Sequence, residues 1–343
     1  MALEFCDSFQ HYSSFTPKWT SYGSVTLATA TPRYAGGTYA TATSNYPSLY
    51  KAGLTNSSTY WLGVAFRWGG VNDITPLFSV FEDGNRQVQA VVDGSGMVKF
   101  HLAGSGENLG SVIATTASGL LVSGVWNYLE MKITIHSSAG VIEFRKNGET
   151  VYSGTSLNTM SYGSGIINGV APFMTQGNAS RGAGSSVMDF YACSDTGSDN
   201  KGFLGDIRVQ AILPSGAGNS TQMTPSAGSN YQCVDEAAPN DDTDYVSETT
   251  AGEKDTYAFG NLTPTSGTVK GTQILISARK DDAGTRTIAP VYRPVSTDYD
   301  GTTVSIGNSY DYVRQVKDVS PATSVAWTIA EINGAEFGVK LVS

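Results

Sequence analysis

The chain has 343 residues, which is enough for two domains of ordinary size, each with a hydrophobic core of its own. Charged residues make up only 15% of it, while Gly (39) and Tyr (18) are abundant, a composition typical of many short strands joined by tight turns. The net charge of −9 argues against nucleic acid and anionic membranes as partners, because an acidic surface repels phosphate groups.

The acidic residues are concentrated towards the C-terminus. Residues 1–213 carry 12 basic and 14 acidic side chains, and residues 214–343 carry 9 and 16. The N-terminus has neither the basic nor the apolar region of a secretory signal, and no apolar run approaches the roughly 20 residues that a membrane helix needs. We therefore expect a protein made in a cytoplasm, without membrane insertion, whose three cysteines remain reduced and partly buried: Cys6, Cys193 and Cys233.

The first part of the chain predicts a series of short antiparallel strands. A strand-like segment opens it at residues 5–9, and short strands are expected within residues 24–50. Residues 60–68 alternate apolar and other side chains as a core strand does. Further strands are expected at 77–81, 87–92 and 97–102, separated by Asp-Gly turns, which is the pattern of a β-meander.

Residues 125–152 predict the hairpin around which the domain is built. Leu129, Met131, Ile133 and Ile135 alternate with polar residues, so one face of the strand should be buried and the other, with Glu130, should be wet. Asn147-Gly148 is a strong hairpin signal, because both residues accept the positive φ of a two-residue turn. Such a sheet must cover its apolar face, and a second sheet is the expected partner, which predicts a β-sandwich.

The end of the first domain and the start of the second follow from composition. We expect closing strands at 187–193 and 202–213, with an acidic loop at 194–200 between them. Residues 214–230 are rich in Pro, Gly, Ser, Asn and Thr, which predicts a linker. The expected organisation is therefore a domain at 1–213, a linker at 214–230 and a second, smaller β-sandwich at 231–343.

The second domain is predicted to be almost entirely β, with one helical turn at 331–335. Its expected strands lie at residues 244–246, 255–259, 269–278, 285–292, 304–306, 324–329 and 337–342.

Residues that could carry catalysis do not form a recognisable set. A glycosidase of this architecture needs paired carboxylates across a cleft, but Glu130 is followed by Lys132 and Glu143 by Arg145, which should compensate their charge on a wet face. His11, His101 and His136 are isolated in the sequence, and no serine lies in a G-x-S-x-G elbow. We assign no catalytic residue and expect a protein that is not an enzyme.

Two acidic segments could in principle hold calcium, but neither has the spacing of a known calcium loop. They contain Asp195 and Asp199 in the first domain and Asp235, Glu236, Asp241, Asp242 and Asp244 in the second. Acidic side chains beside Asn, Pro and Ser are commonly solvated turn formers. We therefore assign no metal ligand and no cofactor.

The first fifty residues are rich in aromatic side chains that have three possible roles. They can pack within the sandwich, make subunit contacts or stack on sugar rings. This group comprises Tyr12, Trp19, Tyr22, Tyr34, Tyr39, Tyr46 and Tyr50. Packing within and around the sandwich is the expected role and subunit contacts are the next, so the ligand-binding residues stay unassigned.

Several segments resemble known families. Residues 5–9, 62–67, 124–132 and 144–151 resemble the concanavalin A-like (laminin G-like) jelly roll. Residues 203–209, 213–214, 230–231, 234–236 and 242–246 are similar to a two-domain protein encoded among the structural genes of tailed bacteriophages, and residues 278–286, 326–329 and 336–339 extend that similarity.

The resemblance implies a non-enzymatic virion structural protein, made in the host cytoplasm and exposed on the particle surface. We expect it at the tail tip or tail fibre, contributing to host adsorption. The alternatives are a capsid decoration protein that stabilises capsomers and a glycan-binding lectin; a glycoside hydrolase acting on capsule is the last class. Expected partners are other virion proteins, further copies of the chain in a trimer, and a host surface glycan.

Overall fold

The computed structural model describes residues 2–16, 18–44, 46–70, 74–105, 108–174 and 182–343. The chain forms two compact units. The first contains residues 1–10 and 14–209, and the second contains residues 210–343 together with residues 11–13. Among the described residues, no helix is both long and apolar enough to span a membrane.

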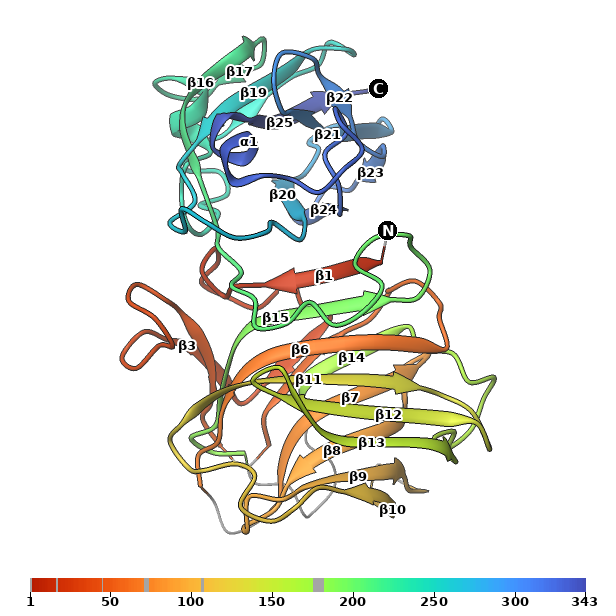
Figure 1. Cartoon of the computed structure of the whole chain (residues 1–343). Coiled ribbons are helices and arrows are strands. Elements are labelled where there is room, and N and C mark those ends of the chain that lie inside the picture. Colours follow the sequence, from red (N-terminus) through yellow and green to blue (C-terminus); the bar gives the residue numbers. More distant parts are fainter. Residues whose placement is uncertain (1, 17, 45, 71–73, 106–107, 175–181) are drawn as a thin grey trace. The chain divides into compact units, whose positions relative to one another are not determined.

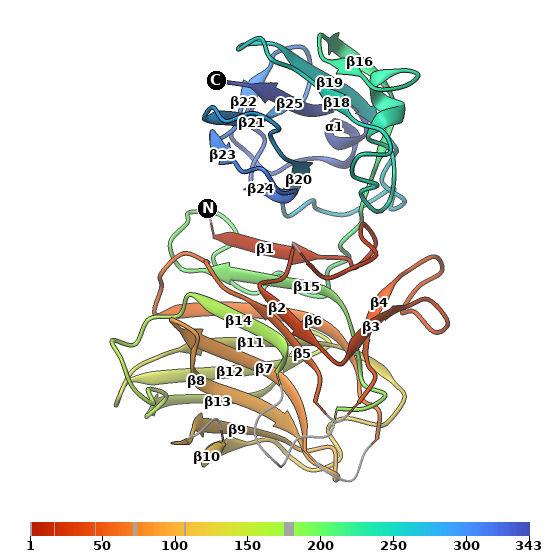
Figure 2. The same ribbon diagram turned by 180° about the vertical axis from the view of Figure 1, so that it is seen from behind.

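The first unit is a jelly-roll β-sandwich of two antiparallel sheets (Figures 1 and 2). An eight-stranded sheet has the order β13-β12-β11-β6-β15-β4-β3, with β1 paired to β15, and a seven-stranded sheet has the order β10-β9-β8-β7-β14-β5-β2. The strands are β1 (Leu3–Asp7), β2 (Ser21–Gly23), β3 (Val25–Ala28), β4 (Tyr39–Ala42), β5 (Ser48–Lys51), β6 (Thr59–Arg67), β7 (Thr75–Glu82), β8 (Asn85–Val92), β9 (Val98–Ala103), β10 (Leu109–Thr115), β11 (Trp126–Thr134), β12 (Gly140–Lys146), β13 (Glu149–Leu157), β14 (Gly169–Met174) and β15 (Ser186–Ser194).

The predicted hairpin is confirmed and lies in the eight-stranded sheet. β11 pairs with β12 from Leu129↔Lys146 to Thr134↔Val141, and β12 pairs with β13 through the Asn147-Gly148 turn. Both turn residues have positive φ, 51° at Asn147 and 86° at Gly148, as a two-residue hairpin turn requires. The inward ring of Phe144 on β12 contacts Phe78 and Phe100 of the opposite sheet, which joins the two layers of the core.

The expectation of a wet outer face on β11 is wrong at its centre. Glu130 is only 1% exposed, and every residue of β15 is buried. The reason is that residues 203–209 cross this face and cover it. These residues were predicted as part of a strand at 202–213, but they form none, because their backbone groups bond to side chains instead of to a neighbouring strand.

The second unit is a smaller two-layer β-structure (Figure 1). Its six-stranded sheet has the order β16-β19-β25-β21-β22, with β23 paired to β21, and separate two-stranded sheets are formed by β20-β24 and β17-β18. Its elements are β16 (Pro214–Thr221), β17 (Thr224–Pro225), the 3-10 helix η3 (Asn230–Cys233), β18 (Val246–Ser247), β19 (Lys254–Phe259), β20 (Thr272–Ala278), β21 (Arg286–Arg293), β22 (Tyr299–Asp300), β23 (Val304–Ile306), β24 (Asp311–Lys317), α1 (Ile329–Gly334) and β25 (Glu336–Leu341).

The core of the second unit joins these sheets. Val313 of β24 and Ile276 of β20 pack with Ile288 of β21 and Leu341 of β25. A second cluster is built around Trp327, which is 1% exposed, and includes Tyr292 and Phe337. The predicted strand at 324–329 is wrong: Ala326 forms only an isolated bridge with Val319, because Trp327 is needed in the core and Thr328 caps α1.

The structure also differs from the linker expected at 214–230. Residues Pro214–Thr221 form β16, which pairs with β19, and the boundary between the compact units falls between residues 209 and 210. The side chains of β16 are too small to show an apolar alternation in the sequence, yet they alternate between intermediate and exposed positions on the sheet edge. Pairing with β19, and not hydrophobicity, makes this segment a strand.

Candidate functional site

The outer face of the eight-stranded sheet carries a buried polar group built around a glycine. Gly63 on β6 lies in register between Glu130 on β11 and Tyr191 on β15. A Cβ at Gly63 would lie 2.0 Å from Cε1 of Tyr191, so the tyrosine ring occupies the space above this glycine. The hydroxyl of Tyr191 donates to Oε1 of Glu130 at 2.5 Å.

Asp189 reaches the same face through a bulge in β15. Its φ is 52°, and the register with β6 shifts between Met188 and Tyr191. At this point the other edge of β15 changes partner, from β4 at Ser186 and Val187 to β1 from Phe190 onwards. A bulge re-aims the side chain of the extra residue, and it places the fully buried carboxylate of Asp189 among polar partners.

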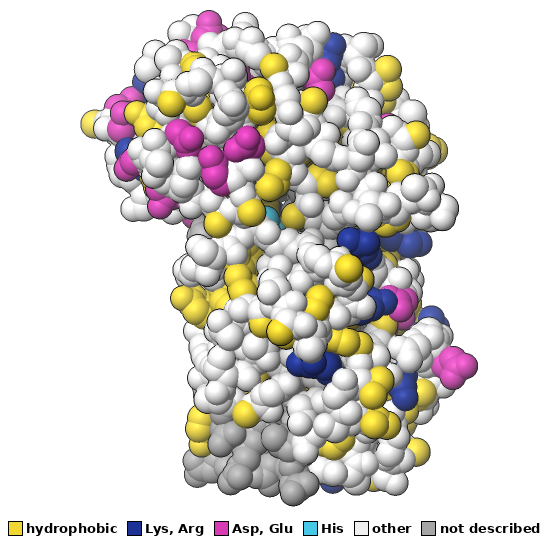
Figure 3. Space-filling view, turned by 90° about the vertical axis from the view of Figure 1, so that its left-hand side faces the viewer, with side chains coloured by type: hydrophobic (Ala, Val, Ile, Leu, Met, Phe, Trp, Pro, Cys, Tyr) yellow, Lys and Arg dark blue, Asp and Glu magenta, His cyan; other side chains and the backbone are white. Residues whose placement is uncertain are grey.

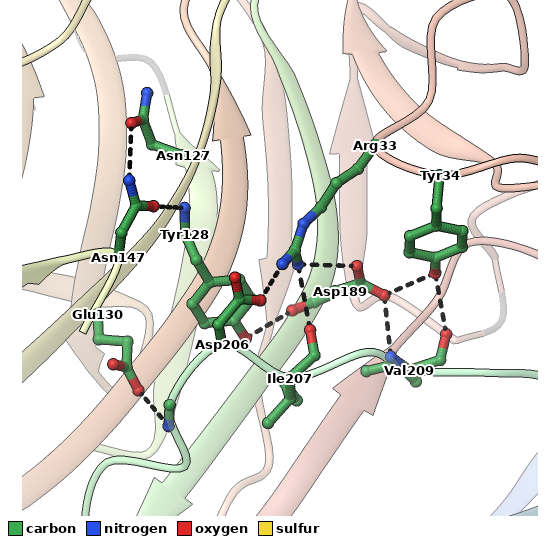
Figure 4. Close-up of polar contacts among 11 residues, drawn as sticks. Arg33, Tyr34, Asn127, Tyr128, Glu130, Asn147, Asp189, Asp206, Ile207 and Val209 are labelled. Atoms are coloured by element: carbon green, nitrogen blue, oxygen red, sulfur yellow. Dashed lines mark hydrogen bonds and ion pairs between the residues drawn. The ribbon is translucent and has the colours of Figure 1, made fainter. Parts of the chain in front are cut away.

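Residues 203–209, which we call the strap, are held across this face by buried side chains (Figure 4). The amide of Leu204 donates to the hydroxyl of Tyr191 at 3.1 Å, and the amide of Gly205 donates to Oε1 of Glu130 at 2.9 Å. The amide of Val209 donates to Oδ1 of Asp189 at 2.9 Å. Side chains of the sheet thus supply the acceptors that a neighbouring strand would supply elsewhere.

Two residues that precede β4 complete the attachment of the strap (Figure 4). Arg33 donates from Nη1 to the carbonyl oxygen of Ile207 at 3.2 Å, lies 3.4 Å from Oδ2 of Asp189 and forms an ion pair with Asp206. The hydroxyl of Tyr34 donates to Oδ1 of Asp189 at 2.9 Å. The guanidinium of Arg208 lies 4.0 Å from the centre of the Tyr34 ring, a cation–π contact.

Burial governs the ionisation of this group. Loss of hydration raises the pKa of Asp189 to about 6, although the Val209 amide, the Tyr34 hydroxyl, Arg33 and Arg208 all favour the charged form. Burial also raises the pKa values of Tyr128 and Tyr191 well above the usual range of tyrosine. The hydroxyl of Tyr128 donates to the backbone oxygen of Asp189 at 3.0 Å.

The polar groups of the strap site hold the strap in place and do not line an open cleft. The carboxylate oxygens of Asp189 and Oε1 of Glu130 already accept hydrogen bonds from the strap or its neighbours. Oε2 of Glu130 is a buried atom without a partner among the described residues. Hydrolysis of a glycoside would require two carboxyl groups that face a sugar across a cleft, whereas these two lie under the strap.

A second carboxylate fastens a loop of the first unit in a similar way. Glu82, at the end of β7, accepts from the amides of Ser164, Gly165 and Ile166 at 2.8, 3.2 and 3.4 Å and from the Ser164 hydroxyl at 2.7 Å. Gln87 donates to the same carboxylate at 2.8 Å. Burial raises the pKa of Glu82, but these donors outweigh it, and the net shift is downward.

Polar side chains also form a row on the outer face of the seven-stranded sheet. Gln89 on β8 lies in register between Ser79 on β7 and His101 on β9. His101 follows the inward Phe100 and therefore points outward. Gln89 donates to the carbonyl of Met174 at 2.5 Å, whereas Ser79 Oγ and His101 Nε2 are buried atoms without a partner in the part of the chain that the structure describes. Because Ser79, Gln89 and His101 are buried, this polar row belongs to the interior of the fold.

The acidic residues considered for calcium lie apart or have protein partners. Asp195 accepts from Ser57 and Asp199 from Ser198, both in the first unit. In the second unit Asp242 binds Arg279 at 2.8 Å and accepts from Tyr310 at 2.9 Å, and Asp244 accepts from Asn240. No group of three or more potential metal ligands is present among the described residues. Acidic side chains are nevertheless conspicuous on the face of the second unit seen in Figure 3.

The remaining candidates from the sequence are Glu143, the three histidines and the three cysteines. Glu143 forms the predicted ion pair with Arg145, at 2.8 Å. His101 lies in the sheet with Nδ1 at 3.1 Å from the Gly110 oxygen, His136 accepts from the amides of Ser138 and Ala139, and His11 meets Tyr12 edge to face. Of the three cysteines, Cys6 is partly buried, and Cys193 and Cys233 are buried.

The aromatic residues of the first fifty positions differ in their exposure. Tyr12, Trp19 and Tyr39 are buried, so packing accounts for them. Tyr22 and Tyr46 remain 43% and 56% exposed and are available for contacts. Tyr34 contributes to the strap site, a role that the sequence did not reveal.

No protein-family model and no curated protein matches this chain. Among solved structures, similarity is found to domain 4 of AbnA, a GH43 extracellular arabinanase from Geobacillus stearothermophilus solved with arabinotriose (14% identity, 56% of this chain and 92% of that one, TM-score 0.38). It is also found to the CBM2 module of the evolved Dit of Lactobacillus casei BL23 phage J-1 (14%, 56% and 94%, TM-score 0.37). A protein of unknown function with a galectin-like fold from Bacillus subtilis is similar as well (10%, 57% and 96%, TM-score 0.38). Scores of this size carry no argument about function.

Proposed function

We propose that this chain is a non-enzymatic structural protein of a tailed bacteriophage virion, exposed on the particle at the tail tip or a tail fibre, where it contributes to host adsorption. The similarity of residues 203–209 and 242–246, among others, to a two-domain phage structural protein supports the virion assignment. The observation that carries the non-enzymatic part is the strap: the two buried carboxylates of that face, Glu130 and Asp189, bind backbone amides of the chain itself.

An adsorption assay tests the proposed role. Purified protein should compete with virions for the host surface and lower the number of particles adsorbed per cell. The control is the same chain unfolded by heat, which should not compete. Unchanged adsorption at saturating folded protein would contradict a role in host attachment. Copy number per virion, measured by quantitative mass spectrometry, separates a tail protein with few copies from a head decoration protein with many.

Glycan binding by the first unit is the second candidate, favoured by the exposed rings of Tyr22 and Tyr46. Aromatic rings can stack on the faces of sugars. A glycan array with and without calcium tests this, with Tyr46→Ala as the variant and His136→Ala, on an exposed loop, as its control. Loss of a signal in the first variant alone is expected; an array without any signal removes this candidate.

A further inference from the structure

A lysine and an aspartate are buried against each other at the end of the first strand. Nζ of Lys18 lies 3.1 Å from Oδ1 of Asp7, the last residue of β1, and the two side chains are 1% and 0% exposed. The amide of Phe9 donates to the same Oδ1 at 2.8 Å, and Nε1 of Trp19 donates to Oδ2 at 2.7 Å. Neither the strap nor the polar row involves this pair.

Aromatic rings surround the pair. Nζ of Lys18 lies 5.4 Å from the centre of the Phe5 ring. Trp19 meets Phe5 edge to face at 5.0 Å, stacks with Phe9 at 6.1 Å and lies 5.7 Å from Phe190. In such a setting two separate charges are expensive, because each has lost its hydration. A product that carries no charge would remove this cost.

We propose that Lys18 and Asp7 join in an intramolecular amide bond, an isopeptide, with loss of one water molecule. The reaction balances without a further reactant. A proton moves from the Lys18 ammonium to Oδ1 of Asp7 along their hydrogen bond, which leaves an amine and a carboxylic acid. The amine nitrogen then attacks Cγ of Asp7 and forms the new C–N bond. Oδ1 departs as water and takes with it the second proton that the nitrogen gives up.

Two features of the site act on this reaction. The indole N–H of Trp19 already bonds Oδ2, the oxygen on which negative charge develops when the nitrogen attacks, so it acts as an oxyanion-stabilising donor. Fixed proximity replaces the concentration of a free reactant, with effective molarities of about 10⁵ M or more for well-oriented groups. The product is a neutral amide, and the free-energy cost of holding two buried charges disappears with it.

The bond would link β1 directly to residue 18, which precedes β2. It would close a short covalent ring between residues 7 and 18 that denaturants and heat cannot open. A surface protein of a particle that survives outside cells gains from such a link, but the chemistry depends only on the pair and its surroundings and not on the function proposed above.

Intact-mass spectrometry of the denatured full-length protein tests the proposal directly. The wild-type chain should be lighter than its sequence mass by one water molecule, and a tryptic digest should yield a branched peptide that joins Lys18 to Asp7. Asp7→Asn should be lighter by one ammonia instead, because the leaving group is then nitrogen. Lys18→Arg, which cannot form the amide, should have its full sequence mass.

The wild-type measurement needs no variant that folds. A wild-type mass equal to the sequence mass, with cleavage by trypsin after Lys18, overturns the proposal and leaves the pair as an ion pair. A loss of water that persists in Lys18→Arg, or that maps to another peptide, overturns it too, because dehydration at an aspartate elsewhere would then be the cause.

Discussion

Asp189 and Glu82 fasten two segments of the same unit by similar bonds, yet their pKa values shift in opposite directions. In both, burial is the largest single influence and raises the pKa. Asp189 is fully buried, and its donors and cations do not overcome this, so its pKa rises to about 6. Glu82 keeps 9% of its surface exposed and receives three backbone amides and a hydroxyl, which lower its pKa.

The difference teaches what each carboxylate contributes to the fold. Glu82 is a charge solvated by the loop 161–166 in place of water, and its ionised form is the stable one. Asp189 has lost its hydration, which disfavours its charged form and raises its pKa to about 6. The attachment of the strap thus depends on well-placed hydrogen-bond donors and acceptors, whereas the attachment of the loop 161–166 depends on the negative charge of Glu82.

The largest effect is expected from removal of the Asp189 carboxylate. Asp189→Ala removes the acceptor of the Val209 amide and one acceptor each of Arg33 and Tyr34, and it should lower the free energy of unfolding of the first unit by about 4 kcal/mol at pH 8. The control is Asp206→Ala, which removes the other carboxylate bound to Arg33 but one that is 48% exposed; it should cost less than about 1 kcal/mol. Denaturant unfolding measures both, and equal losses would contradict the account of the strap.

The two carboxylates should change the free energy of unfolding with pH in opposite directions. The folded pKa of Asp189 lies above its unfolded value, so its contribution favours folding at low pH and is lost as the pH rises through about 6, by about 3 kcal/mol in all. The folded pKa of Glu82 is lowered, so its contribution is present above its unfolded pKa and is lost as the pH falls through the folded value.

Unfolding curves from pH 3 to pH 8 for wild type, Asp189→Asn and Glu82→Gln test this. The stability of wild type relative to Asp189→Asn should fall with rising pH, and its stability relative to Glu82→Gln should rise. Two slopes of the same sign would refute the comparison.

A smaller effect is expected at the other attachment of the strap. Gly63→Ala places a methyl group where the Tyr191 ring lies, so the ring must move away from Glu130 and the Leu204 amide. We expect a loss of about 2 kcal/mol, typical of overpacking, and faster hydrogen exchange at Leu204 and Gly205. Gly202→Ala is the matched control, because nothing lies within 4 Å of its added Cβ; exchange that is unchanged in both variants would exclude a role of Tyr191.

The smallest effect is expected from neutralisation of Glu82. Glu82→Gln keeps one acceptor oxygen but presents a donor to the amides of Gly165 and Ile166 and to Gln87, so about 1 kcal/mol should be lost. Hydrogen exchange at residues 164–166 should accelerate while the strap amides keep their wild-type rates. Glu149→Gln, at an exposed position of β13, is the control. Faster hydrogen exchange at the strap amides as well would mean that the strap and the loop 161–166 are not held independently.

The sequence predicts the sandwich because strand alternation and turn chemistry are local. The strands around Leu62, Val88 and Met131 and the Asn147-Gly148 turn were all visible in this way. β16 was missed because Gly216 and its small neighbours show no apolar alternation and become a strand only through β19. β24 was missed too, although it pairs with β20 along its whole length.

The strap could not be predicted from local pattern, because its partners lie on β11, β15 and the segment before β4. Phe203–Val209 has the composition of a strand, and only the fold shows that its backbone bonds to Glu130, Asp189 and Arg33. Two signals were nevertheless present in the sequence. Asp189 interrupts an apolar strand, as a charge with buried partners requires. Gly63 interrupts another, as the close approach of the Tyr191 ring to the backbone requires.

Immunogold labelling of intact virions of a phage whose genome encodes this chain tests the proposed function most directly. An antibody raised against the folded protein should label the tail tip or the tail fibres. Label spread over the head would contradict the tail location and establish capsid decoration instead. Particles that carry no label, beside a positive signal for free protein in the same lysate, would contradict the virion assignment altogether.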